Sequence, residues 1–188
     1  MFTSVERRLP GDLAMWFFIL AELSVFALLI LAFAAAQMLQ PQAFAEGRAQ
    51  LDTSTGLAMT LSLLTAGLLA ALAQQQLLAG QPRRASGLLL LGLSVAVVYV
   101  WIKLGEYGHL AAAGLGLEHS TFFTLYWILT GFHFLHVLLG MVILAWLAWH
   151  CWHGAYGPGR QSGFESGVLY WHMVDLVWVV LFPLVYVL

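Results

Sequence analysis

Five ionisable side chains lie inside long apolar runs of this sequence. They are Glu22, His133, His136, His172 and Asp175. A charged side chain at the centre of a bilayer costs at least about 2.5 kcal/mol on insertion scales, so each one needs a partner, a water molecule or a neutralising proton. These residue types therefore indicate hydrogen bonding or proton transfer within a membrane.

The spacing of four of these residues places them in pairs. His133 and His136 are three residues apart, as are His172 and Asp175, so each pair shares one face of its helix. The helical rise puts both pairs and Glu22 at similar depths. We expect a buried histidine–aspartate network between the last two helices, and a purely structural role is the favoured reading for its four members.

Glu22 is a different case, because no Lys or Arg lies within the core of the expected spans. Its carboxyl group must contact a histidine or water, or stay protonated. A neutral acid next to lipid would suit a proton relay or a regulatory group. A structural role is equally compatible with the sequence.

The histidines could also hold haem, but only in one arrangement. Two histidines three apart on one helix cannot occupy opposite axial positions, so the ligands would come from facing helices, such as His133 or His136 with His172. The single cysteine, Cys151, leaves neither a disulfide nor a paired thiolate site. We expect no metal site on this chain.

Composition sets the environment of these residues. The chain is 62% hydrophobic and 9% charged, whereas soluble domains carry roughly 25% charged residues. The net charge of -2 gives no reason to expect a nucleic-acid partner. Lipid must be the solvent for most of the chain.

Five segments are long enough to cross a hydrocarbon core about 30 Å thick. We predict an all-α integral membrane protein, a five-transmembrane-helix bundle forming a single domain over residues 1-188, with helices at about 12-39, 54-79, 86-105, 120-151 and 165-187. Asp12 and Asp52 are the expected helix caps. Lys103 is expected to snorkel to the membrane interface, with Glu106 as a second interfacial polar group. Small residues four apart, such as Gly92 and Ala96, would allow close helix packing.

The distribution of Lys and Arg predicts the orientation. Positively charged loops stay in the cytoplasm, and five cations fall on one side of the expected membrane against two on the other. The first group is Arg7, Arg8, Arg83, Arg84 and Arg160, and the second is Arg48 and Lys103. The N-terminus is therefore expected in the cytoplasm and the C-terminus in the periplasm of a bacterial inner membrane.

Four stretches give the chain a resemblance to subunit III of the haem-copper oxidases. They are Met15 to Glu22, the pair Glu106-Tyr107, the region from Ser120 to Val137 with both histidines, and Tyr170 to Trp178. The longer members of that family have seven helices, and this chain begins at the equivalent of their third. Leu9-Pro10-Gly11-Asp12, together with Pro183, resembles the short variant associated with nitric oxide reductase and denitrification.

The resemblance implies a non-catalytic accessory subunit of a respiratory haem-copper oxidase or nitric oxide reductase complex. It implies no redox cofactor on this chain, a catalytic partner carrying haem with copper or non-haem iron, and bound phospholipid. Glu22 would be the family's membrane glutamate, and the subunit would support stability, lipid placement and proton uptake. The other matched residues would orient helices.

Two other classes of function remain open from the residues alone. One is a small membrane cytochrome in which histidines of facing helices carry haem b. The other is a stand-alone proton or solute transporter that uses Glu22 and the histidine–aspartate residues. The five spans show neither an inverted repeat nor glycine-broken helix pairs, which is unfavourable for the transporter.

Overall fold

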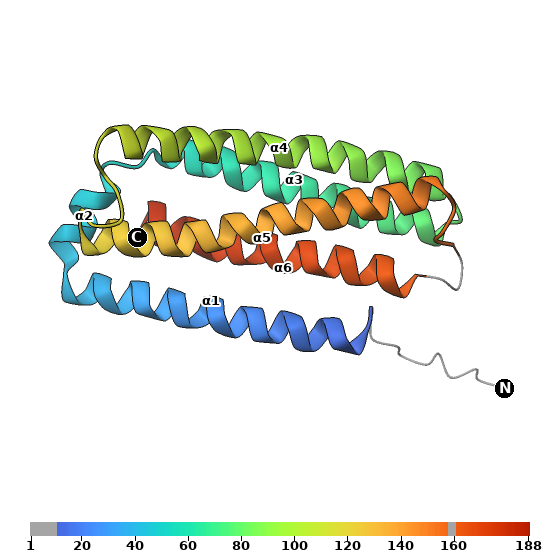
Figure 1. The fold of residues 1–188 in the computed structure, drawn as a ribbon, viewed down its shortest axis with the longest axis horizontal. Coiled ribbons are helices and arrows are strands. Elements are labelled where there is room, and N and C mark those ends of the chain that lie inside the picture. The colour runs from blue at the N-terminus through green and yellow to red at the C-terminus, as the bar shows by residue number, and fades with distance from the viewer. Residues whose placement is uncertain (1–10, 158–160) are drawn as a thin grey trace.

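A computed structural model describes residues 11–157 and 161–188 of the chain (Figure 1). In these residues it contains six α-helices, α1 (Leu13–Leu39), α2 (Pro41–Arg48), α3 (Thr53–Leu78), α4 (Pro82–Ala112), α5 (Thr121–Trp152) and α6 (Ser162–Tyr186). Five residues on which the expected orientation and family placement depend lie outside the described residues: Arg7, Arg8, Leu9, Pro10 and Arg160.

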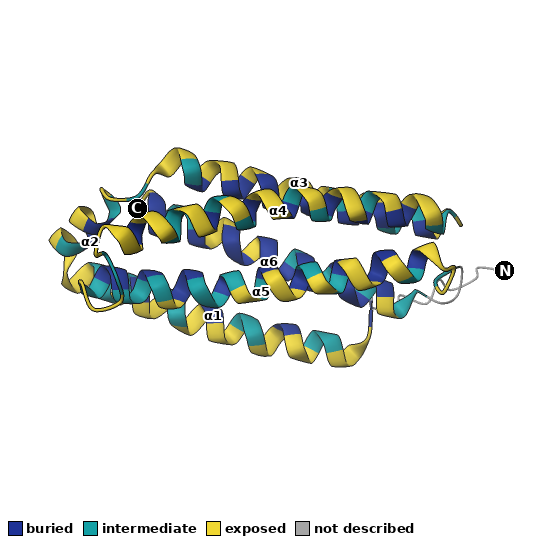
Figure 2. Cartoon of the chain, turned by 45° about the horizontal axis from the view of Figure 1, so that its top comes forward, coloured by how far each residue is buried: buried dark blue, intermediate teal, exposed yellow. Residues whose placement is uncertain are grey.

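The long helices run side by side, and the short α2 lies across one end of the bundle (Figure 1). Within the described residues, α1, α3, α4, α5 and α6 are each long and apolar enough to cross a membrane. The prediction of an all-α protein with five helices able to span a membrane is therefore confirmed. Exposed residues line the outer surface of the bundle, and buried residues face its interior (Figure 2).

Polar side chains at the helix starts satisfy backbone N–H groups that have no partner within the helix. Asp52 Oδ1 accepts a hydrogen bond from the Ser54 N–H at 3.0 Å, and Asp12 Oδ1 accepts one from Ala14 at 3.4 Å. Both residues act as the caps expected from the sequence.

The predicted helix at 86-105 is too short, since α4 extends from Pro82 to Ala112. Proline is favoured in the first turn of a helix, where its missing N–H is not needed, so Pro82 starts α4 instead of preceding it. The C-terminal end of the predicted helix was set at residue 105, because the charge of Lys103 was expected at the membrane surface. That side chain lies inside the bundle, and the helix continues past it.

Helix α2 was not predicted, because eight residues cannot span a membrane and show no long apolar run. Its Phe44 is fully buried. The Phe44 ring lies 5.0 Å from the ring of Phe33 on α1 and 5.4 Å from that of Phe122 on α5. These edge-to-face contacts join α1, α2 and α5 at one end of the bundle.

Four helices form the core of the bundle, and α1 packs on its outside. Contacts join α3 to α4, α4 to α5, α5 to α6 and α6 to α3, whereas α1 contacts α5 and α6 among the long helices. Small residues allow the close approach of α3 and α4, since a Cβ added at Gly92 would lie 3.4 Å from the carbonyl oxygen of Ala66. This arrangement encloses the polar groups described next.

Candidate functional site within the membrane bundle

Glu22 on α1 pairs with His136 on α5. Glu22 Oε2 lies 3.0 Å from His136 Nε2, and His136 Nδ1 lies 2.8 Å from the carbonyl oxygen of Phe132. The two side chains are 22% and 11% exposed, respectively. The Phe26 ring packs 5.1 Å from the imidazole. The membrane glutamate therefore has a histidine partner on a neighbouring helix, as one of the sequence-based readings required.

The donors and acceptors around His136 define where a proton resides. A carbonyl oxygen only accepts hydrogen bonds, so Nδ1 must carry a hydrogen and donate it to Phe132. The bond between Nε2 and Glu22 then contains one proton when the pair is neutral. That proton is held either by a carboxylic acid donating to Nε2 or by an imidazolium donating to a carboxylate, and transfer between the two needs no rearrangement of heavy atoms.

His172 and Asp175 form a second pair, within one turn of α6. His172 Nδ1 lies 3.3 Å from Asp175 Oδ2. The Asp175 carboxylate is directed at Gly67 of α3, where an added Cβ would overlap Oδ2 and lie 3.6 Å from His172 Nδ1. The absence of a side chain at Gly67 thus leaves the space that this carboxylate occupies.

The predicted histidine–aspartate network between the last two helices is wrong in its connectivity. His136 bonds to Glu22 on α1, and His172 bonds to Asp175 on its own helix, which faces α3. His133 is fully buried, and its ring stacks 5.0 Å from that of Trp178. A histidine spacing reports which residues share a face, but not which helix packs on that face.

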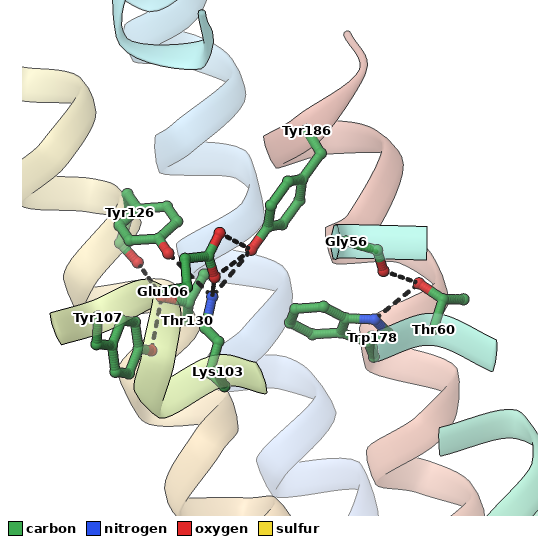
Figure 3. A network of polar contacts seen from close by, with 9 residues as sticks. All are labelled: Gly56, Thr60, Lys103, Glu106, Tyr107, Tyr126, Thr130, Trp178 and Tyr186. Carbon is green, nitrogen blue, oxygen red and sulfur yellow. Dashed lines mark hydrogen bonds and ion pairs between the residues drawn. The ribbon is translucent and has the colours of Figure 1, made fainter. Parts of the chain in front are cut away.

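The largest departure from expectation is Lys103, whose side chain is completely buried. Figure 3 shows it pointing toward Glu106, Tyr126 and Tyr186. Its Nζ donates to Glu106 Oε2 at 2.7 Å, to the Tyr126 hydroxyl at 3.0 Å and to the Tyr186 hydroxyl at 2.9 Å. All three hydrogens of the ammonium group have acceptors, and these come from α4, α5 and α6.

Aromatic rings complete the surroundings of this ammonium group. Lys103 Nζ lies 4.8 Å from the ring centroids of Tyr107 and Tyr126, and 5.6 Å from those of Trp178 and Tyr186. The negative faces of such rings attract a cation within about 6 Å. A carboxylate and four rings thus replace the hydration that Lys103 loses on burial.

Glu106 is satisfied as well, because the Tyr186 hydroxyl lies 2.9 Å from its carboxylate oxygens. Its side chain is 9% exposed and borders a pocket of about 270 Å³ near Asp52 and His109. The expectation that Lys103 and Glu106 are interfacial polar groups is therefore wrong for the lysine, which is sealed inside. The physical reason is that Glu106 and tyrosines on two other helices provide hydrogen-bond acceptors for Nζ inside the bundle.

Further hydrogen bonds extend this cluster to α3 (Figure 3). The Trp178 indole N–H donates to Thr60 Oγ1 at 2.9 Å, and Thr60 donates to the Gly56 carbonyl at 2.9 Å. Tyr107 donates to Thr130 Oγ1 at 2.9 Å. The roles of Tyr126, Tyr186 and Trp178 were not predicted, since single aromatic residues in an apolar helix carry no signal of a buried cation.

These features define a multi-pass membrane protein that keeps ionisable pairs inside an apolar bundle. In residues 11–157 and 161–188, no three His, Cys, Asp or Glu side chains come together as a metal-binding group. The chain belongs to the cytochrome c oxidase subunit III family, whose family model matches residues 5–188. Subunits of this family have no active site of their own, which confirms that prediction.

Individual relatives agree with the family assignment. The chain is 33% identical to cytochrome c oxidase subunit 3 of Lumbricus terrestris over 71% of this chain and 50% of the relative. It is 38% identical to that of Synechocystis sp. over 50% of this chain and 40% of the relative. It is 31% identical to "Heme-copper oxidase subunit I+III" of Aeropyrum pernix over 92% of this chain and 22% of that protein. The chain thus spans about half or less of the length of these relatives.

Proposed function

We propose that this protein is a non-catalytic accessory subunit of a respiratory haem-copper oxidase complex. The observation that carries the proposal is the family match over residues 5–188. The name of the Aeropyrum pernix relative combines subunits I and III in one chain, which supports a catalytic subunit I as the partner. Haem and copper would reside on that partner, and phospholipid would fill the exposed apolar faces of the complex.

The Glu22–His136 pair is the proposed proton-handling group of this subunit. The pair joins α1 to α5. Of the five candidate spans, α1 has the smallest buried share. The single proton in its hydrogen bond can be exchanged without moving the helices. We propose that this pair supports proton uptake by the catalytic partner, whereas the other pairs hold helices in place.

A partner that reduces nitric oxide is the second candidate. Gly11, Asp12 and Pro183 belong to the stretches that resemble the short variant associated with nitric oxide reductase. In that case the partner would carry haem with non-haem iron. The identity of the metal on the co-purified partner distinguishes the two.

The cytochrome and transporter alternatives receive less support from the geometry. Haem ligation by His136 Nε2 would require breaking its hydrogen bond to Glu22, and His133 is enclosed by Trp178, Tyr99 and Phe26. A transporter would need a polar path across the bundle, but the Glu22 and His172 pairs do not share hydrogen bonds among the described residues. Both alternatives would act without a catalytic partner.

We propose the bacterial inner membrane as the location, with the N-terminus in the cytoplasm and the C-terminus in the periplasm. Because Lys103 is buried, it does not act as a loop charge, and Arg48 alone among the described cations lies at the α2 end. Arg83 and Arg84 lie at the opposite end, in the first turn of α4. By the positive-inside rule, these charges favour a cytoplasmic location for that opposite end.

Gentle solubilisation and purification through a tag on this chain test the proposal. The expected result is co-purification of a large haem-bearing subunit. After the two polypeptides are separated, the haem spectrum should be found with that subunit and not with this chain. A haem band that stays with the isolated chain would favour the cytochrome. Proton flux through liposomes containing this chain alone would favour the transporter.

A further inference from the structure

His172 is a polar residue on the outer surface of the bundle, close to the middle of the 25-residue α6. Its side chain is 41% exposed although Asp175, its partner, is only 10% exposed. Nδ1 faces Asp175 Oδ2 at 3.3 Å. Within the part of the chain that the structure describes, no hydrogen bond engages Nε2.

The surface around His172 is apolar and is formed by α3 and α6. Leu176, one turn further along α6, is 57% exposed, and Val179 is 43% exposed. On α3, Leu64 and Leu68 are 43% and 60% exposed, and both lie within one turn of Gly67, which borders the His172 ring. We refer to Leu64, Leu68, His172, Leu176 and Val179 as the His172 face.

The chemistry of the pair defines what Nε2 requires. In the tautomer that satisfies Asp175, Nδ1 carries the hydrogen that faces Oδ2. Nε2 of the neutral ring is then an acceptor with no hydrogen-bond partner among the described residues, on a 41% exposed side chain near the middle of α6. Lipid tails offer no donor, and ionisable residues in membrane spans almost always face protein or water.

We propose that the His172 face is a docking surface for a transmembrane helix of a partner subunit. That helix presents small or apolar side chains to Leu64, Leu68, Leu176 and Val179. It also presents one hydroxyl, amide or indole donor to His172 Nε2. This inference rests on the proposed function only in taking the chain to be a subunit of a larger membrane complex.

Site-directed photocrosslinking in the intact, gently solubilised complex tests the docking surface. p-Benzoylphenylalanine replaces Leu176 in one variant and Val142 in another. Val142 is a matched control, because it is 65% exposed but lies on α5. The Leu176 variant is expected to crosslink to a different polypeptide at least tenfold more than the Val142 variant.

Three results would overturn the proposal: crosslinking of Leu176 to a second copy of this chain, crosslinking to lipid alone, or equal crosslinking from both positions. If the partner co-purifies but Leu176 does not reach it, only the docking surface is wrong. If no partner co-purifies, the proposed function fails first.

A pair of substitutions tests the hydrogen bond separately. His172→Gln retains a polar side chain that can still donate to Asp175, whereas His172→Leu removes both Nε2 and the hydrogen-bond partner of Asp175. Retention of the partner through detergent washing is expected to fall about tenfold in His172→Leu and much less in His172→Gln. Equal retention in wild type and His172→Leu would show that Nε2 has no donor across an interface.

Discussion

The ammonium group of Lys103 lies 2.7 Å from the carboxylate of Glu106 inside the bundle, with the lysine side chain fully buried. The pair sits on consecutive turns of α4, but the hydroxyls that complete it come from Tyr126 and Tyr186. One intrahelical ion pair thus joins three helices. The contribution of this ion pair to the stability of the protein depends on both charges being present.

Removing either charge alone should be more harmful than removing both. Breaking a buried ion pair by removing one partner costs about 3 to 5 kcal/mol, whereas apolar replacement of a whole pair is often close to neutral. We expect Lys103→Met and Glu106→Gln each to lower the stability of the purified protein by amounts in this range. The double variant should lose less than the sum of the two. Additive losses in a thermal unfolding cycle in detergent would contradict a coupled pair.

Glu22→Gln should leave the complex assembled. The glutamine side chain is nearly the same size and can donate to His136 Nε2, so neither a cavity nor an unpaired nitrogen results. The transferable proton is lost, and turnover of the complex or its persistence should decrease. Activity is measured over repeated turnovers after confirming subunit content by gel. Loss of this subunit from the complex would instead indicate a structural role for Glu22.

Gly67→Ala should be destabilising because the new methyl group would overlap Asp175 Oδ2. Overpacking of this kind typically costs about 1 to 3 kcal/mol. Gly87→Ala is the matched control, since a Cβ there meets nothing within 4 Å and alanine is a better helix former by about 1 kcal/mol. Thermal unfolding should show a loss for the first variant and none for the second. Equal behaviour would mean that Asp175 can move away from α3 freely.

The cap of α3 gives a pH-dependent contribution. Hydrogen bonds from Thr55 and Ser54 hold the pKa of the Asp52 carboxyl below its ordinary value. Stabilisation by this group is therefore complete above the ordinary aspartate pKa of about 4. It is lost as the pH falls through the lower folded-state value. Asp52→Asn keeps a capping side chain without a titrating group, so its thermal midpoint should approach that of wild type as the medium is acidified. A constant difference between the two down to low pH would show that Asp52 does not titrate with folding.

Much of the fold could be predicted because lipid limits the backbone to continuous helices. The apolar runs located five spans, and the carboxylates of Asp12 and Asp52 marked two helix starts. The sequence also singled out Glu22 and His136 as polar groups of similar depth. It did not show that they bond to each other, because that contact depends on α1 packing against α5.

Lys103 shows why the rest was not predictable. A lysine near the end of an apolar run normally extends to the interface. Its burial depends on hydroxyl groups of Tyr126 and Tyr186, which are 23 and 83 residues away in the sequence. Only the packing of α4, α5 and α6 brings those groups to one point.

The peripheral position of α1 has a consequence for biosynthesis. It precedes the other spans in the chain, has the highest mean hydropathy of the five at 2.6, and has only 17% of its span buried. A helix with these properties can leave the translocon and remain stable in lipid before its neighbours are translated. Helix α1 can therefore enter the lipid before α3 to α6 do, while the helices that enclose Lys103 cannot close around its charge until Tyr186 has been translated.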